Sequence, residues 1–430
     1  MRKPFSSVAI GLILLSTVAL PPLVFLVFAT SSMHPGVLLV SGLYVFLFMA
    51  LRVISRQFRS RGAGTILIAA VLWVVMAHGA IRFLINGESD FVRFSQSYLL
   101  LILVLLGCFS LATLARRVPN FRAGIAVNLV FYVLILSSVA AILRFSPFSH
   151  GTFLKPVLFF SESSHFALSF LPFMLYATVI ASPRMKLLLI VSSYAIALLL
   201  NSVTLVVGIA LVTAMVIPLR QLLLLVPIAA IPFLLNFSTV TLHYYSSRLD
   251  LFAQDISSTQ NLSAMVFLSG WERAYLNLKD TVGLGVGFQQ FGIIGSRGDI
   301  LESIRIMGGR ASNLLDGGSV APKFIGEFGV LGVTIILVYL VNFAKSARWL
   351  HEVSMNEVAP RDYRRIFFLS CFVMFSIDLF VRGAGYFSSS AFLFVASLMW
   401  LSERERSDKA PNRDGHYIKK SPPRQQSRHR

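Results

Sequence analysis

Long apolar runs recur along almost the whole chain and are separated by short polar segments. Each run approaches the roughly 20 residues that an α-helix needs to cross the hydrocarbon core of a bilayer. Inside lipid every backbone amide and carbonyl must be paired within its own segment, so these runs predict helices and not open strands. We predict about twelve spans, at residues 8–29, 36–52, 65–84, 95–115, 124–144, 164–181, 187–201, 202–218, 221–238, 322–343, 366–383 and 386–401.

The connection between the ninth and tenth predicted spans, residues 239–321, is far longer than the others. Within it, residues 261–278 have the pattern of an amphipathic helix, with Met265, Leu268 and Trp271 near one face. Several glycines follow this segment and indicate tight turns. Because long connections are usually binding loops or lids, we expect the protein to work on the side of the membrane that carries this loop.

The composition agrees with lipid as the main solvent of the chain. Hydrophobic residues make up 56% of it and charged residues only 13%, which is about half the charged fraction of an ordinary soluble domain. Both cysteines, Cys108 and Cys371, lie in apolar runs and form no disulfide or metal-binding pattern. We therefore predict an all-α integral membrane protein with one large loop.

The basic residues are distributed unevenly between the two sides of the predicted membrane domain. Most of the 38 Lys and Arg residues fall on the side that carries both termini, whereas the charges of the other side are nearly balanced. Cytoplasmic loops of membrane proteins carry such an excess of basic residues. The net charge of +19 therefore predicts cytoplasmic termini and a loop on the opposite side, and not a nucleic-acid partner. Residues 1–404 form the predicted membrane domain, and residues 405–430 a disordered basic tail.

Ionisable residues in or beside membrane spans are candidates for function. Glu162 and His165 open the sixth span on the side of the large loop, and their spacing puts them on one helical face. Favourable placement of Glu162 at a helix N-terminus is the alternative interpretation. The eleventh span carries Asp378 and Arg382 one turn apart, which could also form an ordinary salt bridge. The further candidates expected on this membrane face are Arg82, Arg248, Arg273, Asp316 and Glu327.

This combination of side chains suits chemistry on a phosphate-linked sugar. Arginine grips phosphate oxygens with two parallel hydrogen bonds, and a carboxylate or a histidine can take a proton from a sugar hydroxyl. The sequence has no metal-binding motif. The segment from Gly283 to Phe288 is an incomplete dinucleotide fingerprint, because Phe288 stands where the third glycine belongs. We therefore predict no metal and no cofactor, with arginines neutralising a pyrophosphate leaving group.

Three short motifs carry a resemblance to a known family. They are Ser161-Glu-Ser-Ser-His-Phe-Ala; Gly270-Trp-Glu-Arg-Ala followed by Gly283-Leu-Gly-Val-Gly-Phe; and Asp316-Gly-Gly-Ser followed by Glu327-Phe-Gly-Val-Leu-Gly. Together with the layout of spans and loop, they resemble the Wzy-type O-antigen and exopolysaccharide polymerases of the O-antigen polymerase/ligase superfamily. Ser163 departs from the family pattern, in which proline is usual at this position.

The resemblance implies an enzyme of the bacterial inner membrane that joins repeat units carried on undecaprenyl pyrophosphate at the periplasmic face. Its partners would be this lipid-linked oligosaccharide, the bilayer and a chain-length regulator. Glu162, His165 and Asp316 are the alternatives for the general base. The expected substrate-binding and pyrophosphate-binding residues are Arg82, Arg248, Arg273, Glu327 and Arg382.

Two other functions fit parts of the same pattern. Ligases of the superfamily join O-antigen to lipid A–core and use a histidine near the end of the loop, but residues 311–319 contain none, which favours a polymerase. A flippase or secondary transporter would need charges at mid-bilayer and broken helices in matched halves. Most of the charged candidates here are expected at the ends of the spans on the side of the large loop. This placement and the disproportionate length of that loop favour an enzyme.

Overall fold

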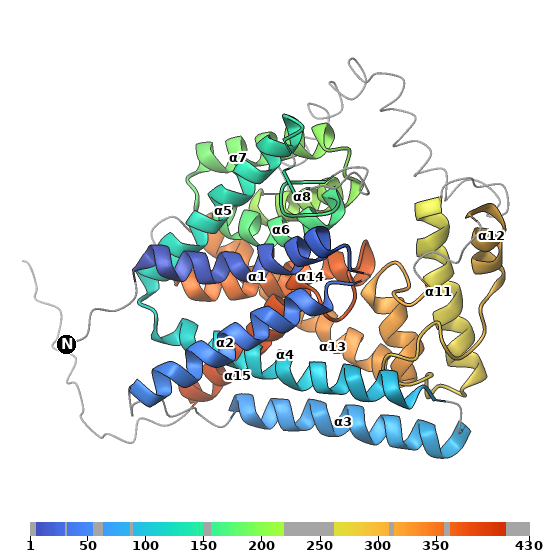
Figure 1. The fold of residues 1–430 in the computed structure, drawn as a ribbon. Coiled ribbons are helices and arrows are strands. Elements are labelled where there is room, and N and C mark those ends of the chain that lie inside the picture. The colour runs from blue at the N-terminus through green and yellow to red at the C-terminus, as the bar shows by residue number, and fades with distance from the viewer. Residues whose placement is uncertain are drawn as a thin grey trace, which may run out of the picture.

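The computed structural model describes residues 6–30, 32–54, 63–86, 89–145, 147–148, 156–218, 262–308, 314–356 and 362–409. The ninth predicted span, Arg248 and most of the predicted tail lie outside these residues. The named elements of the described part are all α-helices (Figure 1). They are α1 (Ser7–Phe28), α2 (His34–Ile54), α3 (Ala63–Asn86), α4 (Phe91–Arg117), α5 (Asn120–Ile142), α6 (Ser163–Ile180), α7 (Pro183–Leu199), α8 (Val203–Val216), α11 (Leu262–Asp280), α12 (Asp299–Gly308), α13 (Val320–Met355), α14 (Tyr363–Phe380) and α15 (Ser389–Lys409).

Each predicted span except the ninth falls on one of these helices. Seven helices, α1 to α6 and α13, are long and apolar enough to cross a membrane. The chain is thus a helical membrane protein, as the apolar runs predict. Helix α13 is longer than its predicted span, and α15 continues to Lys409, past the expected end of the membrane domain.

Helix α6 occupies the centre of the bundle and α3 its edge. In the most apolar stretch of α6, 83% of the residues are buried, whereas in that of α3 only 11% are buried. Figure 1 shows α3 along the border of the bundle, next to α4. A helix at the edge exposes its apolar side chains to lipid, whereas a central helix can hold polar groups away from lipid. His165, at the start of α6, therefore lies in the interior of the protein, whereas Glu162, just before the helix, remains 39% exposed.

The helix ends form two chemically different groups. At one end, called here the basic end, Arg116 at the end of α4 pairs with Glu403 of α15, and Lys186 of α7 donates to the carbonyl and hydroxyl oxygens of Ser354 in α13. The opposite end, called the site end, gathers the starts of α6, α13 and α15 and the end of α14. Helices α11 and α12 lie side by side there (Figure 1).

Helix α13 is interrupted near its start, at Gly329, where φ is 59° and ψ is −134°. The interruption frees backbone groups that need other partners, and the glycine-rich segment 283–287 supplies them. The amide of Gly287 donates to the carbonyl of Glu327 at 2.9 Å, and the amide of Val330 donates to that of Gly283 at 2.8 Å.

Glycine is required in this segment because the two backbones touch. At Gly285 φ is +79°, and a Cβ there would lie 2.5 Å from the carbonyl oxygen of Glu327. Gly285 of the Gly283 to Phe288 motif therefore allows close approach to the interrupted helix.

Candidate active site

Glu162 precedes the first residue of α6 and has an extended backbone, with φ −152° and ψ 159°. Its side chain makes no capping hydrogen bond to the helix. Instead, the carboxylate oxygen Oε1 accepts from the Ser164 hydroxyl and lies 3.3 Å from His165 Nε2. The position at a helix N-terminus thus orients Glu162 without using its carboxylate as a cap.

His165 connects the carboxylate to a buried hydroxyl, since its Nδ1 lies 3.0 Å from Ser161 Oγ. Nε2 of His165 makes an ion-pair contact with Glu162 at 3.3 Å when the imidazole is protonated. The Ser161 hydroxyl can donate to Nδ1 or accept from it, according to the tautomer of the imidazole. Ser161, His165 and Glu162 thus follow one another in contact within one turn of the helix start.

Arg382, in the turn that follows α14, reaches the same carboxylate, with its guanidinium 3.1 Å from Glu162 Oε1. A salt bridge between Arg382 and Asp378 is not formed in the described residues, because α14 ends at Phe380 and the chain unwinds before Arg382. Asp378 instead accepts from the amide of Ala384 at 3.1 Å and from the hydroxyl of Ser390. Asp378 therefore holds the turn that presents Arg382 to Glu162.

These neighbours keep Glu162 ionised. Burial opposes ionisation, but the nearby His165 and Arg382 and the hydrogen bond from Ser164 outweigh it and lower the pKa of Glu162 to about 2. The side chain of Glu162 nevertheless remains 39% exposed. It is therefore a carboxylate that is charged at neutral pH and accessible to a substrate.

A second charged group lies at the start of α13. The ammonium of Lys323 is 3.4 Å from Asp316 Oδ1 and 3.4 Å from Gln289 Oε1, and it lies 5.0 Å from the ring centre of Tyr386. The Lys323 side chain is only 3% exposed, whereas that of Asp316 is 52% exposed.

Asp316 lies near both groups, because its Oδ1 pairs with Lys323 and would lie 3.2 Å from a Cβ at Gly385, in the segment that follows Arg382. The five residues Glu162, His165, Asp316, Lys323 and Arg382 are called the site cluster here. They come from three separate parts of the sequence. Beside His165 lies a cavity of about 10 Å³ lined in part by Ser388 and Ser390, which is about the room needed for one water molecule.

Arg273, another candidate residue, is buried beside the segment that carries Asp316. Arg273 is 2% exposed, donates to the carbonyls of Ser269 and Leu314, and lies 4.4 Å from the ring centre of Phe291. Burial lowers the pKa of Arg273 to about 10, against the opposing charges of Glu272 and Asp316, so it is still a cation at neutral pH. Arg273 thus fastens α11 to the segment that carries Asp316.

Arg82 and Glu327 lie against the glycine-rich segment. Arg82 is buried and packs its stem against Gly287. The carboxylate of Glu327 is fully buried and accepts from the amide of Phe291 at 3.4 Å. Both residues are thus close to the site cluster but are not part of it. Arg248 lies outside the described residues.

Several polar residues of this region were not singled out from the sequence as site residues. Lys323 could have been found, because a lysine inside a span is itself a functional signal. Gln289 could not, because its backbone φ of +59° and its contact with Lys323 depend on the tertiary structure. Within the part of the chain that the structure describes, no three His, Cys, Asp or Glu side chains are placed to hold a metal ion.

No protein-family model matches this chain, and no curated protein matches it.

Proposed function

We propose that the protein is a glycosyltransferase that polymerises oligosaccharide repeat units linked to a lipid pyrophosphate. The observation that carries the proposal is the site cluster, in which the accessible carboxylate of Glu162 lies between Arg382 and His165. Acids, a histidine and cations thus meet at one end of the helices, where the headgroup of a membrane-anchored substrate would lie. The three motifs that resemble Wzy-type polymerases support the same reaction.

In this reaction a sugar hydroxyl of one lipid-linked unit attacks the anomeric carbon of the chain carried by another. A glycosidic C–O bond forms, and the bond between the anomeric carbon and the pyrophosphate breaks. Glu162 accepts the proton of the attacking hydroxyl, and His165 orients the carboxylate. Arg382 and Lys323 stabilise the negative charge that develops on the leaving pyrophosphate.

The low pKa of Glu162 before substrate binds has a consequence for this step. A carboxylate with a pKa of about 2 is a weak base, because general bases work best when their pKa is near the working pH. Arg382 is one cause of the lowered value, and a pyrophosphate would compete for the same guanidinium. Substrate binding would therefore raise the pKa of Glu162 toward its ordinary value and make it a better base.

The cellular setting follows from the resemblance and is part of the proposal. The substrate would be an undecaprenyl-pyrophosphate oligosaccharide at the periplasmic face of a bacterial inner membrane, and a chain-length regulator would be a partner. Arg248 belongs to the proposal as a pyrophosphate-binding residue. Arg273, expected from the sequence to bind pyrophosphate, is buried, and its role in the proposal is to hold the segment that carries Asp316. His165 and Asp316 remain the alternative bases.

Substitution of Glu162 by glutamine tests the proposal, because it removes basicity and preserves size. In cells that depend on this protein, Glu162→Gln should accumulate single repeat units at normal protein abundance, with a loss of about 10²–10⁴-fold in rate. Glu162→Asp should retain some activity. The matched control is Glu302→Gln, which alters an exposed carboxylate of α12 paired with Arg305 and should leave the polymer unchanged. A full polymer ladder from Glu162→Gln would remove Glu162 from the mechanism.

A transporter of lipid-linked oligosaccharide is the second candidate. Buried charges within the helices, such as Lys323 and Glu327, and the interruption of α13 at Gly329 favour it. A transporter needs two separated compartments, whereas an enzyme does not. The purified protein in detergent, mixed with lipid-pyrophosphate oligosaccharide, should form longer saccharides if it is a polymerase. Unchanged saccharide length with demonstrably folded protein would favour the transporter.

A further inference from the structure

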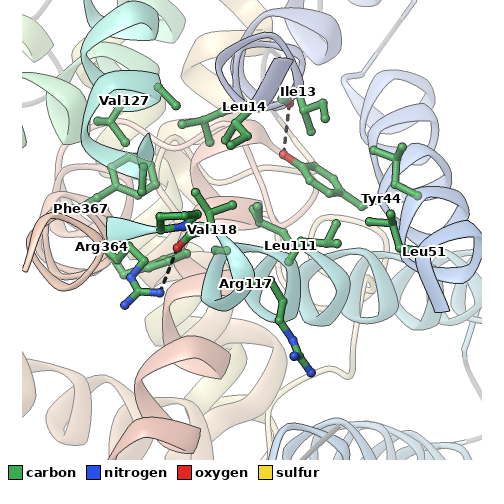
Figure 2. A pocket seen from close by; sticks show the side chains of 18 residues that line it. Ile13, Leu14, Tyr44, Leu51, Leu111, Arg117, Val118, Val127, Arg364 and Phe367 are labelled. Atoms are coloured by element: carbon green, nitrogen blue, oxygen red, sulfur yellow. Dashed lines mark hydrogen bonds between the residues drawn. The ribbon is translucent and has the colours of Figure 1, made fainter. Parts of the chain in front are cut away.

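An apolar cavity of about 260 Å³ lies at the basic end of the bundle, far along the helices from the site cluster. Five helices enclose it: the starts of α1, α5 and α14 and the ends of α2 and α4. Figure 2 shows Leu14, Leu111, Val127 and Phe367 arranged around a common space. The lining is almost entirely apolar; the exceptions are Tyr44, Arg117 and Arg364.

The polar exceptions are not aimed into the apolar space. The hydroxyl of Tyr44 donates to the carbonyl of Ile13 at 3.1 Å, which removes it as a ligand for water. Arg364 donates to the carbonyls of Arg116 and Val118 at 2.9 and 3.1 Å. Figure 2 shows the guanidinium of Arg117 directed away from the apolar lining. The space is therefore apolar within and cationic at its border.

A cavity of this kind selects its occupant. Water is disfavoured because it finds no polar partners there, and an empty apolar cavity forgoes dispersion contacts. The occupant is therefore a hydrocarbon, and in a bilayer the available hydrocarbon is a lipid chain. A second copy of the protein does not fit, because the space is narrower than a helix with its side chains.

The charge at the border identifies the headgroup. Arg117 and Arg364 both line the cavity, and Nε of Arg364 is buried without a hydrogen-bond partner among the described residues. Arginine favours phosphate, and each basic residue near a membrane surface adds about 1 kcal/mol of attraction for anionic lipid. We propose that this cavity binds one anionic glycerophospholipid, with an acyl chain between the helices and the phosphate against Arg117 and Arg364.

The experiment compares phosphatidylglycerol with phosphatidylcholine of the same acyl chains, added to the purified, delipidated full-length protein. Lipid retention is measured by native mass spectrometry, and folding is followed by the thermal unfolding midpoint. We expect the wild type to retain phosphatidylglycerol preferentially. Arg117→Gln should reduce this preference about five-fold, which corresponds to one basic residue, with a smaller loss of phosphatidylcholine, whose phosphate is balanced by its own choline cation. Arg184→Gln, on the exposed face of α7 at the same end, is the matched control and should behave like the wild type.

Filling the cavity tests the chain-binding part separately. Ala123→Phe places a ring in the cavity and should lower retention of both lipids at least about ten-fold, because the acyl chain loses its contacts. Ile125→Phe, on the lipid-facing side of α5, is the matched control. If Ala123→Phe does not accumulate, Ala126→Leu fills the same space with a smaller side chain. Equal retention of the two lipids by the wild type, or wild-type retention by the folded cavity-filling variant, would overturn the proposal.

Discussion

The two ends of the bundle place buried lysines in different surroundings. At the basic end, Lys186 donates to the carbonyl and hydroxyl oxygens of Ser354 and so fastens α7 to α13. At the site end, Lys323 lies 3.4 Å from each of two side-chain oxygens, those of Asp316 and Gln289. A hydrogen bond to a backbone carbonyl fixes a helix, whereas contacts to side-chain oxygens at 3.4 Å can be exchanged for a ligand. The same residue type therefore serves assembly at one end and is available for binding at the other.

The backbone is irregular at the site end and regular at the basic end. Around the site cluster, α13 is interrupted at Gly329, and Gln289 adopts a φ of +59°, which is uncommon for a residue with a side chain. At the basic end, α4 runs without interruption to Arg117. Strained backbone persists where the surrounding structure holds it, and it concentrates at functional sites. The site end therefore differs from the basic end in its backbone as well as in its charges.

The largest expected effect is a difference in cysteine labelling between the two ends, which shows on which side of the membrane each end lies. A cysteine replacing Arg305 of α12 should react with a membrane-impermeant maleimide in cells whose outer membrane is permeabilised. A cysteine replacing Arg184 should react only after lysis, because the basic end is expected to face the cytoplasm. The native Cys108 and Cys371 are buried and should contribute little labelling. Labelling of both positions from the same side would contradict the predicted topology.

The two buried lysines provide the second prediction. Lys323→Met should lower polymer formation about 100-fold, because a cation that stabilises the leaving group is lost, with little change in the unfolding midpoint. Lys186→Met should leave activity intact but destabilise the protein by about 1–3 kcal/mol, because the oxygens of Ser354 lose a buried donor. Polysaccharide gels and thermal unfolding of the purified variants measure the two effects. If Lys323→Met lost stability and Lys186→Met lost activity, the distinction between the two ends would be wrong.

The smallest expected effect concerns the pH dependence of stability at the site end. The pKa of Glu162 is about 2 in the folded protein and 4.5 ordinarily, so its stabilising contribution is complete above pH 4.5. This contribution is lost as pH falls through about 2. The difference in unfolding midpoint between the wild type and Glu162→Gln should therefore be constant from pH 7 to pH 5 and shrink below 4.5. Because the side chain is 39% exposed, solvent screens the interaction and the change should be modest. A difference that is unchanged at pH 3 would show that the charge of Glu162 does not stabilise the fold.

Much of the candidate site could be anticipated because its signals are local. Glu162 and His165 are three residues apart at the start of an apolar run, and this spacing alone places them on one face. The partner of Arg382 could not be anticipated in the same way. Its spacing from Asp378 suggests a salt bridge, but the end of α14 at Phe380 breaks the helical geometry on which that suggestion depends.

The sequence by itself determined which segments are helices in lipid, because each apolar run must satisfy its own backbone hydrogen bonds and does so independently of the others. Only the tertiary structure decided that Arg382 approaches Glu162, that Arg273 is buried, and that the Gly283 to Phe288 motif bridges an interrupted helix. These contacts depend on which helix ends pack together. Residues far apart in the chain make them, and the spacing of residues along one segment carries no information about such pairs.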